Sequence, residues 1–271
     1  MAADRPPETA VGRVSRWSLT AVATAGFVYL FTPIVVIVAF SFNKPRGKFN
    51  IIWRQFTLDN WRDPFAPGPL TDAMFLSLKI AAIAAFVATV LGSLIALALV
   101  RYRFRGGALV NLLLVLPITT PEIVMGSSLA TLFIDWGWQR GFTTIVIAHI
   151  LFCTSFVALT VKARIRGFDW SLEDAAMDLG APPWRTFSRV TLPLITPGIL
   201  AAALLSFALS IDDFIITFFN SGSEETFPIR IFGASRVEIS PQINVLATIV
   251  LVSSVSLMLA GVLFRRRLDT A

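Results

Sequence analysis

Long apolar blocks alternate with short polar segments along the whole chain, and this pattern predicts a helical membrane protein. An α-helix needs about 20 apolar residues to cross the hydrocarbon core of a bilayer. Six blocks reach that length, at residues 17–42, 71–100, 107–134, 142–161, 194–219 and 243–264. The first exceeds the ~7–15 apolar residues of a cleavable signal peptide, so we expect it to be retained. The predicted fold class is all-α, a polytopic membrane protein with six transmembrane helices.

The composition agrees with a membrane location. Hydrophobic residues make up 55% of the chain and charged residues 15%, whereas soluble domains carry about 25% charged residues. The mean hydropathy is +0.74. The formal charge of +6 does not indicate nucleic-acid binding, because the basic residues flank the apolar blocks. The single cysteine, Cys153, lies within a block and excludes an internal disulfide or a cysteine metal cluster.

The distribution of basic residues predicts the orientation. One set of polar segments holds 14 of the 23 lysines and arginines, and the set on the opposite side holds 8. The richer set consists of residues 1–16, 101–105, 162–193 and 265–271. Basic residues favour the cytoplasmic side of a membrane and attract anionic lipid.

We therefore expect a disordered cytoplasmic tail over residues 1–16 and a periplasmic loop over residues 43–70. A core of five helices follows over residues 71–264. It contains a cytoplasmic loop at 162–193, and a cytoplasmic tail at 265–271 closes the chain.

The polar segment 171–193 has a helical pattern of its own. Leu172, Ala175, Ala176 and Leu179 share one helix face. Ser171 and Asp174 resemble a capping box, and Gly180 suits the residue after a helix. Pro183 forces Pro182 out of the α region. A second short helix is expected from Trp184, ending at Leu192 and Pro193. Two helices joined by a rigid elbow are suited to docking against a partner.

Familiar catalytic and nucleotide-binding motifs are absent from the sequence. It has no phosphate-binding loop of the G-x-x-x-x-G-K-[ST] type and no H-E-x-x-H zinc motif. The only histidine, His149, lies in the middle of an apolar block, where a hydrogen bond between helices is the favoured role. Cys153 follows four residues later on the same face, and we interpret that pair as packing.

Three carboxylates lie in or near apolar blocks, namely Glu122, Asp212 and Asp213. Ionisable groups at membrane depth are costly and usually face a cavity or a partner. Adjacent helical residues point about 100° apart, so Asp212 and Asp213 cannot both face lipid. They are candidates for a cation-attracting position on a transport path. The alternatives are a polar contact that fixes helix packing, or a position near the outer interface.

The polar segment 171–193 closely resembles the EAA coupling motif of ABC importer permeases. That motif reads E-A-A, three residues, G, nine residues, I-x-L-P. Here Asp174-Ala175-Ala176 precede Gly180 by that spacing, and Val190-Thr191-Leu192-Pro193 follow it. The resemblance implies a type I importer permease fold in the bacterial inner membrane, with both termini cytoplasmic and the segment forming coupling helices in a groove of a separate ATPase.

Further implications of the resemblance concern partners and residues. A second permease, two ATPase subunits and a periplasmic solute-binding protein would complete the complex, together with membrane lipid and without nucleic acid. ATP and Mg²⁺ would bind the ATPase, so this chain would be no enzyme and carry no cofactor. The implied ATPase-coupling residues are Glu173, Asp174, Ala175, Ala176, Gly180, Ala181, Pro183, Trp184, Leu192 and Pro193.

A narrower resemblance concerns the substrate. The stretches LPITTPEIVMG, LSIDDFIITFFNSG and SPQINVLAT are similar to the second permease of spermidine/putrescine importers. This implies a polyamine substrate, with Asp212, Asp213 and Glu122 on its path. An ABC permease for an amino acid, an opine or another organic cation is the first alternative.

Two other classes explain the sequence less well. An ion-coupled secondary transporter would leave the polar segment 171–193 without a role. An integral membrane enzyme would need a convergent catalytic set that the sequence does not supply.

Overall fold

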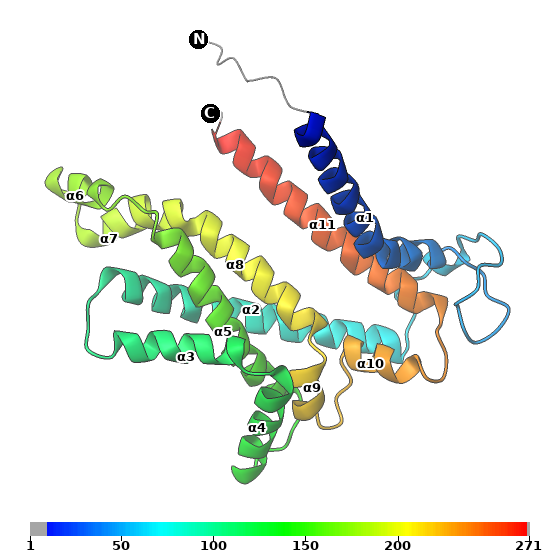
Figure 1. Cartoon of the computed structure of the whole chain (residues 1–271). Coiled ribbons are helices and arrows are strands. Elements are labelled where there is room, and N and C mark those ends of the chain that lie inside the picture. Colours follow the sequence, from blue (N-terminus) through cyan, green and yellow to red (C-terminus); the bar gives the residue numbers. More distant parts are fainter. Residues whose placement is uncertain (1–9, 270–271) are drawn as a thin grey trace. The chain divides into compact units, whose positions relative to one another are not determined.

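The computed structural model describes the backbone of residues 10–269 and the side chains of residues 17–256. The chain folds into two units, Met1–Ala66 with Ala234–Ala271, and Pro67–Gly233. Helices make up almost all of the regular structure (Figure 1). Within the described residues the only β-type pairings are the isolated bridges Asn43–Phe56 and Phe49–Ile239. The all-α prediction is confirmed.

The first unit pairs the two terminal helices, α1 (Ala10–Phe40) and α11 (Pro241–Asp269), which contact each other. The helix α1 begins inside the stretch predicted to be a disordered tail, so that prediction is wrong for residues 10–16. Pro6 and Pro7 precede this point and no proline follows before Pro33, so nothing interrupts a helix there. Residues 1–9 lie outside the described part of the chain.

Between these helices the chain forms a loop held by two buried asparagines. The Asn43 amide donates to Asn50 Oδ1 at 2.7 Å, and the Asn50 amide donates to the Phe40 carbonyl at 2.8 Å. The loop includes the short 3₁₀ helix η1 (Asp59–Trp61). Its backbone also pairs with Ile239, just before α11.

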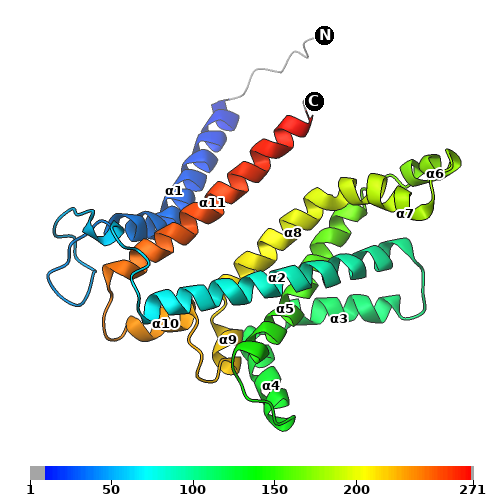
Figure 2. The ribbon, with the colours of Figure 1, turned by 180° about the vertical axis from the view of Figure 1, so that it is seen from behind.

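The second unit is built on three long helices that pack together, namely α2 (Pro69–Arg101), α5 (Phe142–Ile165) and α8 (Leu192–Asp212) (Figures 1 and 2). Small buried residues recur every four positions along α2, at Ala84, Ala88, Gly92 and Ala96. A Cβ on Gly92 would lie 2.7 Å from Val157 Cγ1, and one on Gly198 would lie 2.6 Å from Arg164 Cγ. Small residues thus let the helix backbones approach closely, as in other membrane bundles.

Shorter elements complete the second unit. They are α6 (Ser171–Asp178), α7 (Pro183–Thr186), the π-helical turn η2 (Phe187–Thr191), α9 (Ile215–Asn220) and α10 (Phe227–Ala234). The Phe227 amide donates to Ser77 Oγ at 2.8 Å, which fixes the start of α10 against α2.

The predicted third span is a sharply bent pair of helices, α3 (Gly107–Thr119) and α4 (Glu122–Asp135). Their axes differ by 109°. Pro121 explains the break, because the residue before a proline is driven out of the α region, and Thr120 has ψ 132°. Within the described residues four helices are long and apolar enough to cross a membrane, or five if the bent pair counts as one span.

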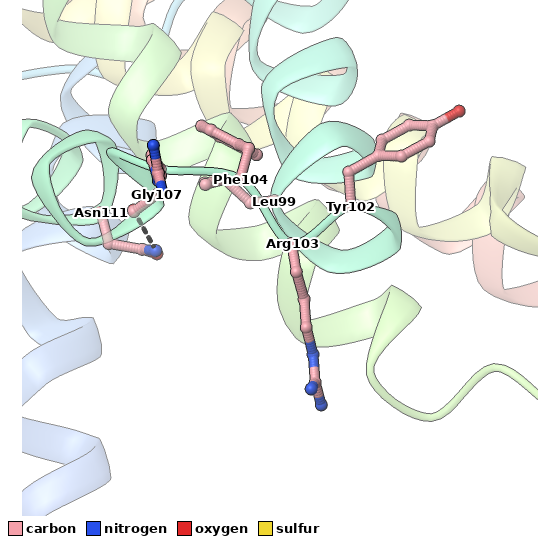
Figure 3. Close-up of a pocket in the computed structure, with 7 residues that line it drawn as sticks. Leu99, Tyr102, Arg103, Phe104, Gly107 and Asn111 are labelled. Atoms are coloured by element: carbon pink, nitrogen blue, oxygen red, sulfur yellow. Dashed lines mark hydrogen bonds between the residues drawn. The ribbon is translucent and has the colours of Figure 1, made fainter.

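The connection between α2 and α3 is a tight basic loop. Gly106 has φ +99°, a conformation that glycine adopts without the steric cost of a side chain. The loop surrounds a shallow hollow of about 420 Å³ that includes Arg103, Phe104 and Asn111 (Figure 3).

Candidate functional site

The polar segment 171–193, here called the coupling hairpin, begins with a different cap from the one predicted. The Ser171 amide donates to Asp169 Oδ1 at 3.1 Å, whereas Asp174 takes no part in the cap. Trp170 occupies the N-cap position with helical backbone angles, so Ser171 already lies inside α6 and cannot form a capping box with Asp174. The capping-box prediction is wrong, although the predicted helix is present.

The end of α6 is a Schellman turn built on Gly180. The Gly180 amide donates to the Met177 carbonyl at 2.8 Å, and the Ala181 amide donates to the Ala176 carbonyl at 3.0 Å. These are the two hydrogen bonds that define the motif. Gly180 has φ +86°, where any side chain would be strained. Pro182 follows in an extended conformation, which confirms the prediction that it lies outside the α region.

The second part of the hairpin does not stop at Leu192 and Pro193. Helix α7, the π-helical turn η2 and α8 form one continuous 30-residue helix, Pro183–Asp212. The Leu192 amide donates to the Phe187 carbonyl across the wider π turn. This local widening accommodates Pro193, which has no amide hydrogen to donate, within the first turn of α8. The predicted helix end is therefore wrong, and the hairpin continues directly into the membrane helix.

Glu173 anchors the hairpin to the rest of the unit. Its residue exposure is 3%. Its carboxylate lies 2.7 Å from Arg101 Nη1, at the last residue of α2, and also accepts a hydrogen bond from the Thr191 hydroxyl. Arg101 in turn lies over the Trp170 ring, 5.6 Å from its centroid. Glu173 therefore faces the rest of its own unit and holds α6 against both α2 and η2.

The remaining coupling residues divide between an outer and an inner surface. Leu179 and Trp184 are 90% and 75% exposed. Asp174, Ala175, Gly180, Pro183 and Pro193 are also exposed, whereas Ala176, Ala181 and Leu192 are half-buried. The exposed residues give the hairpin an outer surface on which large apolar side chains lie among small and charged ones. The sequence alone did not indicate Arg101 and Thr191 as site residues. Both contact Glu173, which lies 72 positions from Arg101 and 18 positions from Thr191 along the chain.

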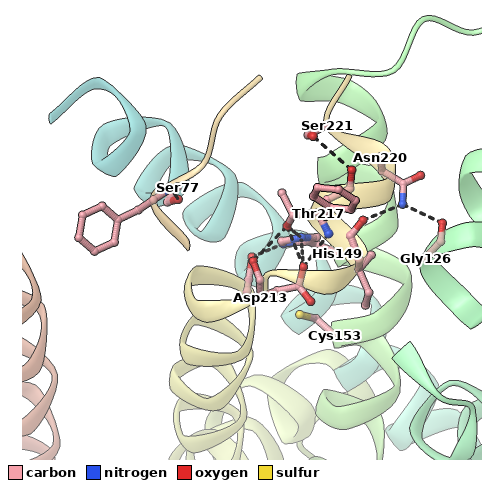
Figure 4. A network of polar contacts seen from close by, with 12 residues as sticks. Ser77, Gly126, His149, Cys153, Asp213, Thr217, Asn220 and Ser221 are labelled. Carbon is pink, nitrogen blue, oxygen red and sulfur yellow. Dashed lines mark hydrogen bonds and ion pairs between the residues drawn. The ribbon is translucent and has the colours of Figure 1, made fainter. Parts of the chain in front are cut away.

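At the other end of α8 the structure separates the two adjacent aspartates. Helix α8 ends at Asp212, and Asp213 has ψ 124°, which breaks the helix. The predicted span 194–219 is thus two helices, α8 and α9. The Asp213 carboxylate accepts hydrogen bonds from the Thr217 amide at 2.8 Å and from the Thr217 hydroxyl at 2.7 Å (Figure 4). Asp213 therefore caps the start of α9, which satisfies backbone groups that the break would otherwise leave unpaired.

His149 completes this buried network. Its Nδ1 lies 2.7 Å from Ser210 Oγ, and its Nε2 lies 2.9 Å from Thr217 Oγ1 and 3.4 Å from Asp213 Oδ2 (Figure 4). A neutral imidazole with its proton on Nε2 satisfies both hydroxyl contacts. His149 joins α5 to α8 and α9, so the predicted hydrogen bond between helices is confirmed.

Cys153 packs beside this network. Its thiol lies 3.6 Å from the Ser206 carbonyl and is fully buried. The described residues contain no group of three or more histidine, cysteine or acidic side chains placed to hold a metal ion.

Asp212 and Glu122 lie on exposed positions at two helix breaks. Asp212 is the last residue of α8, and Glu122 is the first residue of α4. The helices behind them pack closely, because a Cβ on Gly126 would lie 3.2 Å from Ile216 Cα. The Asn220 amide also donates to the Gly126 carbonyl at 3.2 Å. Of the three predicted carboxylates, the Asp213 side chain is therefore buried, whereas Asp212 and Glu122 are exposed.

The chain matches a known protein family. Residues 88–270 match the family described as "Binding-protein-dependent transport system inner membrane component". The chain belongs to this family. It is a multi-pass permease of the inner membrane and a transport subunit rather than an enzyme, as the sequence resemblance implied.

Individual relatives agree with the family. The chain is 40% identical over 257 residues to the spermidine/putrescine transport system permease protein PotC of Escherichia coli (strain K12), covering 94% of this chain and 96% of the relative. It is 38% identical over 245 residues to the putrescine transport system permease protein PotI of the same organism, covering 88% and 86%. A crystal structure of a bacterial ABC transporter for the acidic polysaccharide alginate matches with a TM-score of 0.68 and 13% identity, covering 97% of this chain and 99% of that one. This last likeness concerns the fold alone.

Proposed function

We propose that the chain is a permease subunit of an ATP-driven polyamine importer, for spermidine, putrescine or both. The named substrates of the two relatives support this proposal, since each is similar over most of its length. The observation in this chain that carries it is the exposed Asp212 carboxylate at the end of the spanning helix, directly before the buried carboxylate of Asp213. An exposed carboxylate attracts a polycation, and carboxylates at membrane depth usually line a path for a charged solute.

Asp212 and Asp213 have different parts in this proposal. Asp212 and Glu122 face the path and contact the solute. Asp213 keeps the helix break in place through Thr217 and His149, and so holds Asp212 at the end of α8. Asp213 therefore contributes to the substrate path by positioning Asp212.

The coupling hairpin docks into a groove of a separate ATPase subunit. Its exposed Leu179 and Trp184 fill apolar pockets there, and Ala175 allows close approach. Movement of the groove then passes along the continuous helix Pro183–Asp212 to the carboxylates, over about 45 Å at ~1.5 Å per residue. Glu173 transmits the same movement to α2 through Arg101. Coupling of this kind requires different contacts in the inward-facing and outward-facing states.

The proposed topology has six spans, with both termini and the hairpin in the cytoplasm. The bent pair of α3 and α4 counts as the third span and α11 as the sixth. Residues 43–70 form a periplasmic loop, and residues 71–264 form the permease core. The proposed partners are a second permease, two ATPase subunits that bind ATP and Mg²⁺, and a periplasmic solute-binding protein.

Affinity purification from native membranes tests this proposal. A tagged chain should retain an ATPase and a second membrane subunit. The solute-binding protein of the same complex should melt at a higher temperature with spermidine or putrescine and not with amino acids or sugars. Absence of an ATPase would contradict the coupling role. A binding protein that responds to another solute would contradict the substrate and leave the coupling role intact.

A further inference from the structure

We infer that the hollow between α2 and α3 binds the phosphate headgroup of an anionic membrane lipid, in the leaflet on the side of the coupling hairpin. The hollow has a volume of about 420 Å³ and is lined by Leu99, Tyr102, Arg103, Phe104, Arg105, Gly107 and Asn111. The inference needs only a membrane location for the chain and is independent of the transported solute.

Two unpaired guanidinium groups supply the positive charge. Arg103 and Arg105 are exposed, and among the side chains that the structure describes neither has an ion-pair partner. In Figure 3 the Arg103 side chain extends away from the ribbon. Their neighbour Arg101 is already bound to Glu173. No acidic residue lines the hollow, so an anion entering it would meet only cations and neutral groups.

Two further positive contributions come from the base of the hollow. Gly107 is the first residue of α3, so the positive end of this 13-residue helix faces the same space. The Asn111 amide donates to the Gly107 carbonyl at 2.8 Å (Figure 3). Asn111 Oδ1 in turn accepts a hydrogen bond from Lys162 Nζ. The Lys162 ammonium group is therefore held directly behind Asn111, where it adds positive charge near the hollow.

The position of the loop identifies the anion as a lipid. Arg101 at the end of α2 contacts α6, so this loop lies on the same side of the membrane as the coupling hairpin. It connects a helix long enough to span the bilayer with the bent pair, which places it at headgroup level. Tyr102 is an exposed aromatic residue of the kind that favours this interface. Leu109 and Leu112 on α3 are 59% and 55% exposed and offer an apolar surface to acyl chains. Basic residues at this depth attract anionic headgroups.

The test is native mass spectrometry of the complex purified from its membrane, titrated with dioleoyl phosphatidylglycerol. The wild type should retain at least one phosphatidylglycerol that dioleoyl phosphatidylcholine does not displace. Each basic residue strengthens binding to an anionic surface roughly five-fold, so Arg103→Gln with Arg105→Gln should weaken the adduct about 25-fold. The variant Arg103→Lys with Arg105→Lys should keep most of it.

A matched control removes two exposed arginines from the other unit, with Arg46→Gln and Arg54→Gln, and should keep the adduct. If both double glutamine variants lose the phosphatidylglycerol adduct equally, the inference is overturned, because lipid retention would then depend on net charge alone. Displacement by millimolar inorganic phosphate would also overturn it, since the hollow would then be a general anion site. If the double glutamine variant fails to assemble, equal retention of the two lipids by the wild type overturns the inference.

Discussion

The Arg101 guanidinium lies 2.7 Å from a carboxylate oxygen of Glu173, so the last residue of α2 is joined directly to the first turn of α6. The carboxylate is almost completely buried, whereas the guanidinium is 35% exposed. This ion pair makes the coupling hairpin part of the rigid three-helix core.

Removing one member of this pair should destabilise the protein. In Arg101→Met the buried Glu173 carboxylate loses its cationic partner, at a cost of about 1–3 kcal/mol. We expect a melting temperature about 3–8 °C lower in detergent. Arg103→Met, which removes an unpaired neighbouring arginine, should change the melting temperature little.

The double variant Arg101→Met with Glu173→Met should recover most of the loss, because no uncompensated charge remains. Strictly additive effects of the two single substitutions would show that Arg101 and Glu173 do not interact.

Substitutions at Gly180 should act through the backbone alone. A Cβ there meets no atom within 4 Å, but the φ of +86° disfavours every residue with a side chain. ATP-dependent uptake should fall in the order glycine, asparagine, alanine, valine, because asparagine tolerates this conformation best. Gly180→Pro should abolish transport while membrane insertion continues. Normal transport by Gly180→Pro would refute the coupling role of this turn.

The two aspartates should have separable effects. Asp212→Asn should raise the KM for polyamine uptake at least several-fold and leave the melting temperature nearly unchanged, because its carboxylate is exposed. Asp213→Ala should lower the melting temperature, because loss of the cap on Thr217 costs about 0.5–2 kcal/mol. Kinetic and thermal measurements on the same preparations separate these roles. Identical profiles for both variants would contradict the division.

Close helix packing at Gly92 should tolerate no larger residue. In Gly92→Ala the new Cβ would lie 2.7 Å from Val157 Cγ1 and 2.9 Å from the Ala158 amide nitrogen, so α2 and α5 must separate. Overpacking of this kind costs about 1–3 kcal/mol. Adding Val157→Ala should restore part of the stability, and Gly68→Ala, in open space, should cause no comparable loss. If Val157→Ala restores no stability, the contact of the new Cβ with the Ala158 backbone accounts for most of the destabilisation.

The sequence predicts much of this architecture because membrane helices and glycine turns carry local signals. Apolar length located α2, α5 and α8, and the spacing around Gly180 located the Schellman turn. Local signals could not predict the continuous helix through Pro193, because it depends on a π turn that absorbs the missing amide hydrogen. They also could not predict the 109° bend at Pro121, since prolines kink or end helices to different extents.

The candidate site was predictable in its residues but not in their roles. Asp212 and Asp213 look equivalent in sequence. Only the folded chain brings His149 and Ser210 from other positions to bury Asp213 and leaves Asp212 exposed. The same limit applies to Glu173, whose partner Arg101 is 72 residues away. Long-range contacts of this kind leave no periodic pattern in one sequence.

We propose that this permease carries polyamines and is driven by an ATPase through the coupling hairpin. Uptake of radiolabelled spermidine into proteoliposomes containing the whole complex tests it most directly. We predict uptake that requires ATP and the loaded binding protein, is competed by putrescine and is lost in Gly180→Pro. Spermidine uptake that continues without ATP, or a complex that imports an amino acid and not spermidine, would contradict the account.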